Sequence, residues 1–164
     1  MTFLHAMTDT DFAWMMGEAG AQSPDLTLPD VPIASAEIIT MLRGIAADLA
    51  AADDRPVAWL AAEAGAVVAM IGFTRRGADG RYELGYGVAP AHRGRGIMTR
   101  ALACLLPVLA VQGHDSLTVE TSVDNPASQH VLERNGFARS GTREDPEDGA
   151  LILWAIDLYQ KAET

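Results

Sequence analysis

The feature that most constrains this chain is a turn rich in glycine and arginine, His92-Arg93-Gly94-Arg95-Gly96-Ile97, between a predicted strand and a predicted helix. Gly94 and Gly96 allow a tight turn, with no side chain to obstruct a ligand. The free amides and the positive dipole end of the following helix favour an anion. The alternative is a plain surface turn. Its place between strand and helix predicts a phosphate-binding loop, although it matches neither a Walker loop nor the glycine spacing of dinucleotide-binding proteins.

The distribution of charge supports a local anionic ligand. The net charge of the 164 residues is −10, yet six of the twelve basic residues lie between Arg75 and Arg100. Nucleic-acid binding depends on a basic surface that neutralises phosphates, so we expect no nucleic-acid partner. A negative surface is compatible with cationic partners, and its alternative role is to keep the protein in solution.

Length and composition predict one domain with an ordinary core. We expect no membrane partner, because no apolar run reaches the roughly 18 residues of a membrane span. The N-terminal residues do not resemble a signal peptide, so a cytoplasmic location is the default. Cys104 is the one cysteine, which we expect in the core. No metal site is predicted, because histidine, aspartate and glutamate show no metal-ligand spacing.

Hydrophobic periodicity predicts an α/β pattern with a mixed sheet: two helices, three strands, a helix, a strand, a helix and a final hairpin. The second helix is capped by Ser35, and Pro107 predicts a kink or an early end in the third. The expected helices cover residues 9–19, 35–53, 96–112 and 125–135, and the expected strands cover 57–63, 67–74, 81–88, 116–123, 137–142 and 150–158.

Two motifs resemble the acyl-CoA-binding motifs of the GNAT N-acetyltransferases. The first comprises residues 82–90 and 93–102. The second, residues 119–121, 125–128 and 131–137, is similar to the RimJ/RimL branch, bacterial enzymes that acetylate protein N-termini and related amines. The resemblance implies a GNAT fold over residues 1–164 as a single acyltransferase domain. Its mixed, mostly antiparallel sheet would be splayed between the fourth and fifth strands, and helices would cover both faces.

The resemblance also implies acetyl-CoA as the acyl donor. Its pantetheine arm would pair with the backbone at Val88, and Asn125 would contact the arm unless it serves only as a helix cap. Met98 stands where the family has glycine or alanine, so its side chain must point away from the pyrophosphate. That pyrophosphate would be held by the backbone amides of Arg93, Gly94, Gly96, Met98 and Thr99. The full predicted cofactor-binding set is Tyr86, Gly87, Val88, Arg93, Gly94, Arg95, Gly96, Ile97, Met98, Thr99, Asn125 and Ser128.

Acetyl transfer to an amine needs a base for the amine, a hydrogen-bond donor for the thioester oxygen and a proton donor for the departing thiolate. The family usually provides the oxygen's donor from the amide at Val88. The RimJ/RimL resemblance places Ser128 near the sulfur as proton donor. A related branch uses a tyrosine one turn later, where this chain has Leu132. Local capping is the alternative role for a serine in a first helical turn.

Three glutamates are candidates for the base. Glu120, which we favour, lies on the strand entering the cleft, where other GNAT branches keep a catalytic glutamate. Glu83 lies on the opposite side of the splay. Glu147 resembles, by its offset from Ser128, a glutamate proposed as base in RimL-like enzymes. The alternative for each is a solvated carboxylate, most of all for Glu147 in its acidic run.

We therefore expect an N-acetyltransferase that transfers an acetyl group from acetyl-CoA to a primary amine by direct attack in a ternary complex. The acceptor would be a protein N-terminus or a small-molecule amine, and the acidic residues 144–148 favour a cationic one. The alternative is a catalytically weak GNAT scaffold that binds acyl-CoA as a sensor or partner module. Monomer and homodimer are both compatible with the sequence.

Overall fold

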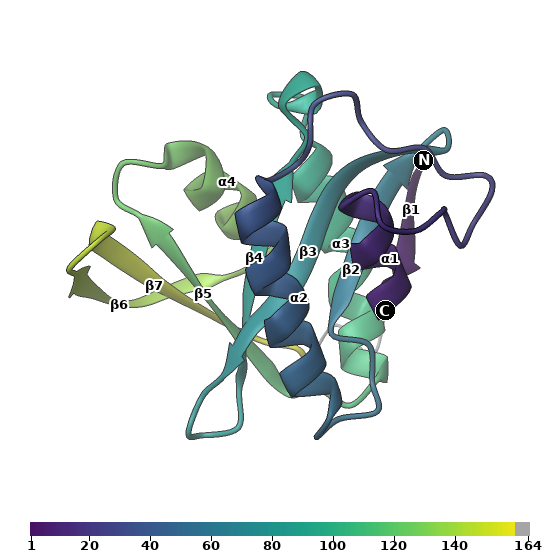
Figure 1. Ribbon diagram of the computed structural model, residues 1–164. Helices are drawn as coiled ribbons and strands as arrows, with labels where there is room; N and C mark the ends of the chain where they lie inside the picture. Colours follow the sequence, from purple (N-terminus) through teal and green to yellow (C-terminus); the bar gives the residue numbers. More distant parts are fainter. Residues whose placement is uncertain (160–164) are drawn as a thin grey trace.

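The computed structural model describes residues 1–159, so the last five residues of the predicted domain lie outside it. These residues form a seven-stranded sheet in the order β1-β2-β3-β4-β5-β7-β6 (Figure 1). The strands are β1 (Thr2–Ala6), β2 (Ala58–Glu63), β3 (Ala66–Arg76), β4 (Tyr82–Val88), β5 (Ser116–Ser122), β6 (Ala138–Asp145) and β7 (Gly149–Asp157). The α-helices are α1 (Asp9–Met15), α2 (Ala36–Ala50), α3 (Ile97–Val111) and α4 (Pro126–Arg134).

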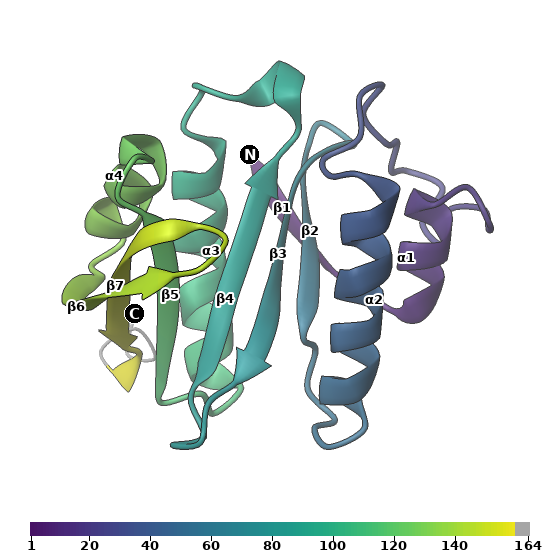
Figure 2. The ribbon, with the colours of Figure 1, turned by 60° about the vertical axis from the view of Figure 1, so that its left-hand side comes forward.

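Strands β4 and β5 are parallel, and the other neighbouring strands pair antiparallel. Only three residue pairs join β4 to β5, from Tyr82 with Leu117 to Leu84 with Val119. Beyond these pairs the two strands diverge, as Figure 2 shows. This opening is the predicted splay, and it lies between the fourth and fifth strands of a mixed, mostly antiparallel sheet, as expected.

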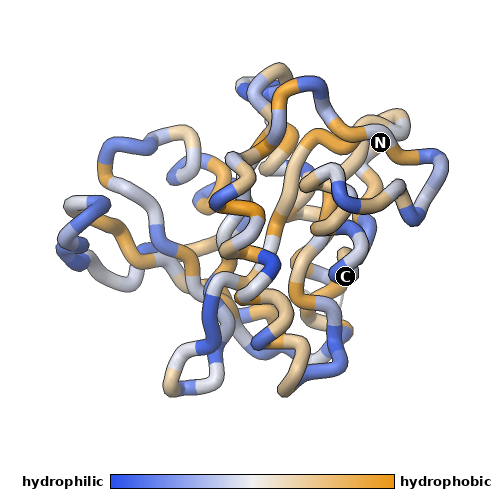
Figure 3. The backbone as a smooth tube through the Cα atoms, viewed as in Figure 1, coloured by the Kyte–Doolittle hydropathy of each residue, from blue (hydrophilic) through white to orange (hydrophobic). Residues whose placement is uncertain are grey.

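Helices cover both faces of the sheet (Figures 1 and 2). On the α3 face, α3 and α4 pack against Tyr82, Leu84 and Trp154. On the α2 face, α1 and α2 pack against Leu60 and Met70. Side chains alternate along a strand, so Glu83 and Gly85 lie on the α2 face of β4. Figure 3 shows hydrophilic residues gathered at the β6–β7 turn, away from these two cores.

The sequence prediction missed strand β1. Its five residues pair antiparallel with β2, from Thr2 with Glu63 to Ala6 with Trp59. Helix α1 ends at Met15 instead of residue 19, because Gly17 takes a positive φ of 76°. Strand β6 is longer than expected and runs to Asp145, which shortens the acidic turn.

Helix α3 continues through Pro107 to Val111, so the expected early end was wrong. Leu105, Leu106 and Leu109 are buried on both sides of the proline, and their packing on the sheet offsets the lost backbone hydrogen bond. Cys104 is exposed, because it lies on the opposite side of the helix from these leucines, and its predicted place in the core was also wrong.

No helix among the described residues has the length and apolar character needed to cross a bilayer. Within residues 1–159 there is also no group of three or more histidine, cysteine, aspartate or glutamate side chains placed to bind a metal ion.

Candidate active site

A cavity of about 740 Å³, here called the turn pocket, opens on the α3 face where β4 and β5 part. The end of β4, the glycine-arginine turn and the starts of α3 and α4 surround it. Every residue of the predicted cofactor-binding set except Arg95 lines it, and their role in binding stays a prediction. The lining residues not in that set are His92, Ala127, His130, Val131 and Arg134.

The glycine-arginine turn has the backbone shape that only glycine adopts readily. Gly94 and Gly96 have φ values of 78° and 70°, and Gly96 directly precedes α3. The first amides of α3 have no acceptor within the helix and face the pocket end of the turn. The Arg93 amide, in contrast, donates to the Pro90 carbonyl at 3.4 Å, so it is less available to a ligand than expected.

The sequence analysis required the Met98 side chain to point away from the ligand side of the turn, and the structure agrees. Its side chain is only 4% exposed and belongs to the core under α3. The Met98 side chain therefore points away from the turn. Arg100 contributes something that the sequence analysis missed: its guanidinium donates to the Arg95 carbonyl at 2.7 Å and pairs with Glu63 at 3.1 Å. Arg100 therefore braces the turn from outside the pocket.

The start of α4 brings Ser128 to the pocket. Asn125 caps the helix, because its side-chain oxygen accepts from the Ser128 amide at 3.1 Å. The Ser128 hydroxyl lies 2.7 Å from the Tyr86 hydroxyl, across the opening from β4, and so it does not serve as a local cap. Burial raises the pKa of Tyr86, while the hydrogen bond to Ser128 lowers it by less. Leu132 is fully buried in the core beneath α3.

Asn135 ties α4 to the start of α3. The sequence analysis placed it only at the end of the expected helix 125–135, yet it is buried and its side-chain amide donates to the Thr99 carbonyl at 3.2 Å and the Val131 carbonyl at 2.9 Å. A buried amide needs such partners. The signal that could have revealed it is a polar residue close to the apolar Leu132 and Phe137.

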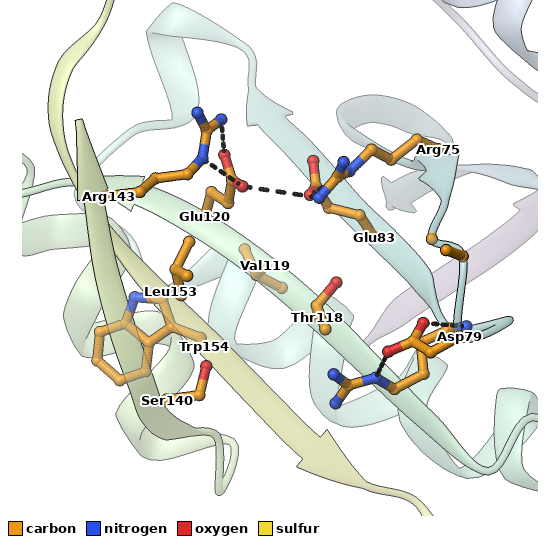
Figure 4. A pocket seen from close by; sticks show the side chains of 13 residues that line it. Arg75, Asp79, Glu83, Thr118, Val119, Glu120, Ser140, Arg143, Leu153 and Trp154 are labelled. Carbon is orange, nitrogen blue, oxygen red and sulfur yellow. Dashed lines mark hydrogen bonds and ion pairs between the residues drawn. The ribbon is translucent and has the colours of Figure 1, made fainter. Parts of the chain in front are cut away.

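On the α2 face, two of the predicted bases are held by arginines (Figure 4). Both oxygens of Glu120 accept from Arg143, at 2.9 and 2.7 Å, and this pairing raises the pKa of Arg143. Glu83 accepts from Thr74 at 2.9 Å and from Arg75 at 3.0 Å. Both carboxylates are therefore already engaged.

Glu147 lies in the exposed turn between β6 and β7, where its backbone amide donates to Asp145 at 2.9 Å. Its carboxylate makes no ion pair with any described residue. Nevertheless, the fold brings the three glutamates around one cavity of about 620 Å³, here called the acidic pocket. It is lined by Thr74, Glu83, Leu84, Gly85, Glu120, Ser122, Glu147, Asp148 and Leu151.

Comparison with known proteins agrees with this geometry. The acetyltransferase (GNAT) domain family matches residues 2–138. A ribosomal-protein-serine acetyltransferase of Escherichia coli is 36% identical over 66 residues, which are 40% of this chain and 37% of that protein. The match thus spans little more than a third of the relative's length.

Solved structures share the fold at low sequence identity. A chimera of the spermidine N-acetyltransferase SpeG from Vibrio cholerae has a TM-score of 0.69 at 14% identity, over 99% of both chains. RimL, a ribosomal α-N-protein acetyltransferase in complex with coenzyme A, has a TM-score of 0.67 at 19% identity, over 95% of this chain and 93% of that one. These structures and the E. coli relative agree with the RimJ/RimL-like resemblance. With more than half of its residues matched by the family model, the chain belongs to the GNAT acetyltransferase family, as its two motifs predicted.

Proposed function

We propose that the protein transfers an acetyl group from acetyl-CoA to a primary amine by direct attack in a ternary complex. One observation carries the proposal: strand β4 lines the turn pocket with Tyr86, Gly87 and Val88 and the acidic pocket with Glu83 and Gly85. The two pockets lie on opposite faces of the sheet and adjoin where β4 separates from β5. An acyl donor on one side and an amine on the other would meet at this opening.

The turn pocket suits coenzyme A. Two glycines with positive φ and the free amides at the start of α3 form an anion-binding backbone, and Arg93 and Arg134 add positive charge at the pocket. Acetyl-CoA, when bound, supplies an activated acetyl group. The coenzyme A bound in the RimL structure supports the same choice of cofactor.

The Val88 amide has the direction required to stabilise the thioester oxygen. The Ala89 amide donates to the Val68 carbonyl of β3 at 2.8 Å. Successive amides of a strand point to opposite sides, so the Val88 amide points toward the gap between β4 and β5. A donor fixed there stabilises negative charge that develops on the oxygen during transfer.

Ser128 is the proton donor in this proposal, and Tyr86 positions it. The serine hydroxyl would donate its proton to the leaving thiolate and regain one from solvent, while the Tyr86 hydroxyl at 2.7 Å holds the serine in place. Because burial raises the pKa of Tyr86, its phenol stays protonated at neutral pH.

We assign the base to Glu147 in preference to Glu120. Arg143 occupies both oxygens of Glu120, and Thr74 and Arg75 occupy Glu83. Glu147 lines the same pocket with its carboxylate in solvent, where it can take a proton from the ammonium directly or through water. In this arrangement Glu147 and Asp148 supply the unpaired negative charge that attracts the amine.

The acceptor, partners, location and oligomeric state that we propose follow the sequence analysis. The acceptor is an amine, either a protein N-terminus or a small molecule, and the names of RimL and of SpeG support both classes. The net charge of −10 argues against a nucleic-acid partner. We place the protein in the bacterial cytoplasm, as a monomer or homodimer.

The direct test is release of coenzyme A. The purified protein, supplied with acetyl-CoA and a broad panel of amines, is expected to release free thiol only when a suitable amine is present. Calorimetry with acetyl-CoA in the absence of an amine measures binding separately. Tight binding with no thiol release for any amine would contradict the proposal and favour the alternative, an acyl-CoA-binding scaffold.

A further inference from the structure

An apolar groove of about 300 Å³ lies on the α2 face, between helix α2 and strands β3 and β4. Phe12, Ile33, Ile38, Leu42 and Met70 provide large apolar walls. No charged side chain among the described residues lines it. Its polar members are Thr74 and Tyr86, and the Tyr86 hydroxyl is directed to Ser128 on the other face.

Glycines keep the groove open. Gly72, Gly85 and Gly87 form part of its floor, so the sheet carries no side chains at these positions. A Cβ at Gly85 would lie 2.7 Å from Thr74 Cγ2, and one at Gly87 would lie 3.4 Å from Ile33 Cγ2. The hollow is therefore a built feature of β3 and β4.

The groove adjoins both of the other pockets. Thr74 and Gly85 line the groove and the acidic pocket, while Tyr86 and Gly87 line the groove and the turn pocket. The acidic pocket is lined by four carboxylate residues: Glu83 and Glu120 pair with Arg75 and Arg143, while Glu147 and Asp148 make no ion pair with any described residue. A positive charge is therefore favoured at the mouth of the groove, and apolar surface is favoured inside it.

We propose that the acceptor is a primary amine with a single positive charge and an uncharged apolar body. The ammonium lies in the acidic pocket and the body lies in the groove between Ile38, Leu42 and Met70. This inference rests on the proposed function and names its acceptor class. A polyamine would place a second ammonium among apolar side chains with no carboxylate to pair with it, which is costly.

A matched pair of substrates tests the class. Hexylamine and 1,6-diaminohexane have the same length, but the diamine carries a second charge. We expect kcat/KM for hexylamine to exceed that for the diamine by about tenfold or more, because a buried unpaired ammonium is unfavourable. From propylamine to hexylamine, kcat/KM should rise roughly fourfold per methylene until the groove is full. Equal or higher kcat/KM for the diamine overturns the proposal, as does a flat alkylamine series.

Two variants of α2 test the groove itself. Ile38 lines the groove and is 45% exposed, whereas Met41 is 56% exposed on the same helix and does not line it. Ile38 is the third residue after the cap Ser35, where an acidic side chain favours the helix, so Ile38→Asp should fold. It should lower kcat/KM for hexylamine about tenfold and raise that for the diamine.

Met41→Asp is the matched control and should change neither value. Equal effects of the two variants would overturn the groove as the acceptor site. Thiol release with spermidine or a serine-initiated peptide, but not with alkylamines, would overturn the acceptor class and leave the proposed function standing. No release with any amine would overturn the proposed function and this inference together.

Discussion

The two sides of the β4–β5 opening are built in different ways. The turn pocket takes most of its lining from one stretch of chain, residues 86–99, and presents backbone amides at the start of α3. The acidic pocket and the apolar groove collect side chains from α1, α2, β3, β4, β5 and the β6–β7 turn. A binding site made of backbone is set by a local motif, whereas a site made of distant side chains depends on how the whole fold packs.

The largest effect is expected from Ser128→Ala, on the α3 face. Loss of the proton donor should lower kcat about 10³-fold, while the affinity for acetyl-CoA, measured by calorimetry, should remain close to that of the wild type. Ser140→Ala, at an exposed position of β6, is the control and should leave kcat unchanged. An unchanged kcat for Ser128→Ala would remove this residue from the mechanism.

The next largest effect tests the α2 face. Glu147→Gln should lower kcat about 10²-fold, since water replaces an exposed base only in part. Glu120→Gln should lower it only a few-fold, because it removes a partner of Arg143 that solvent can replace. Steady-state kinetics with hexylamine measures both. The reverse order of effects would restore Glu120 as the base.

A third variant tests the backbone character of the turn pocket. Gly96→Ala places a side chain at a φ of 70° and a Cβ 3.2 Å from Arg100 Nη1. A left-handed conformation costs about 1–2 kcal/mol outside glycine, so the variant turn should leave this conformation when no ligand is bound. Binding must then restore it, and the Kd for acetyl-CoA should rise about tenfold. Gly149→Ala meets the same conformational cost at a φ of 75° in the β6–β7 turn, and there the Kd should not change. Equal Kd values for the two variants would show that the turn does not contribute to acetyl-CoA binding.

A smaller effect than that of Gly96→Ala is expected from Tyr86→Phe, which removes one hydrogen bond from Ser128. Such a bond contributes about 1 kcal/mol, so kcat should fall roughly fivefold. Burial raises the pKa of Tyr86, so the phenol keeps its proton at every pH below its usual value of about 10. The pH profile of wild-type kcat should therefore show no decrease assignable to Tyr86 below that pH. A decrease at lower pH that Tyr86→Phe abolishes would contradict this assignment.

The same contrast between backbone and side chains explains what the sequence could predict. The strand, turn and helix around Gly94 and Gly96 follow from local residue types and were placed correctly, whereas the splay was implied by the family resemblance. The ion pair between Glu120 and Arg143 joins residues 23 positions apart, and no local pattern indicates it. Strand β1 was missed because its five residues form an edge whose partners lie about sixty residues further along the chain.

Pairings that cross the cleft were also beyond the sequence analysis. The contact between Tyr86 and Ser128 joins residues 42 positions apart. The bridge from Asn135 to the Thr99 carbonyl spans 36 positions. The sequence analysis assigned Tyr86 to cofactor binding, Ser128 to cofactor binding and proton donation, and Asn135 to the end of a helix, because those roles need no partner distant in the sequence. Tertiary packing gives these side chains their positions.

The central claim is that residues 85–88 of β4 are the junction of donor and acceptor sites. A crystal structure with coenzyme A and hexylamine bound together tests it most directly. We expect the sulfur within hydrogen-bonding distance of the Ser128 hydroxyl, the amino group facing the acidic pocket and the alkyl chain against Ile38 and Leu42. Coenzyme A bound outside the turn pocket, or hexylamine bound away from β4, would contradict the claim.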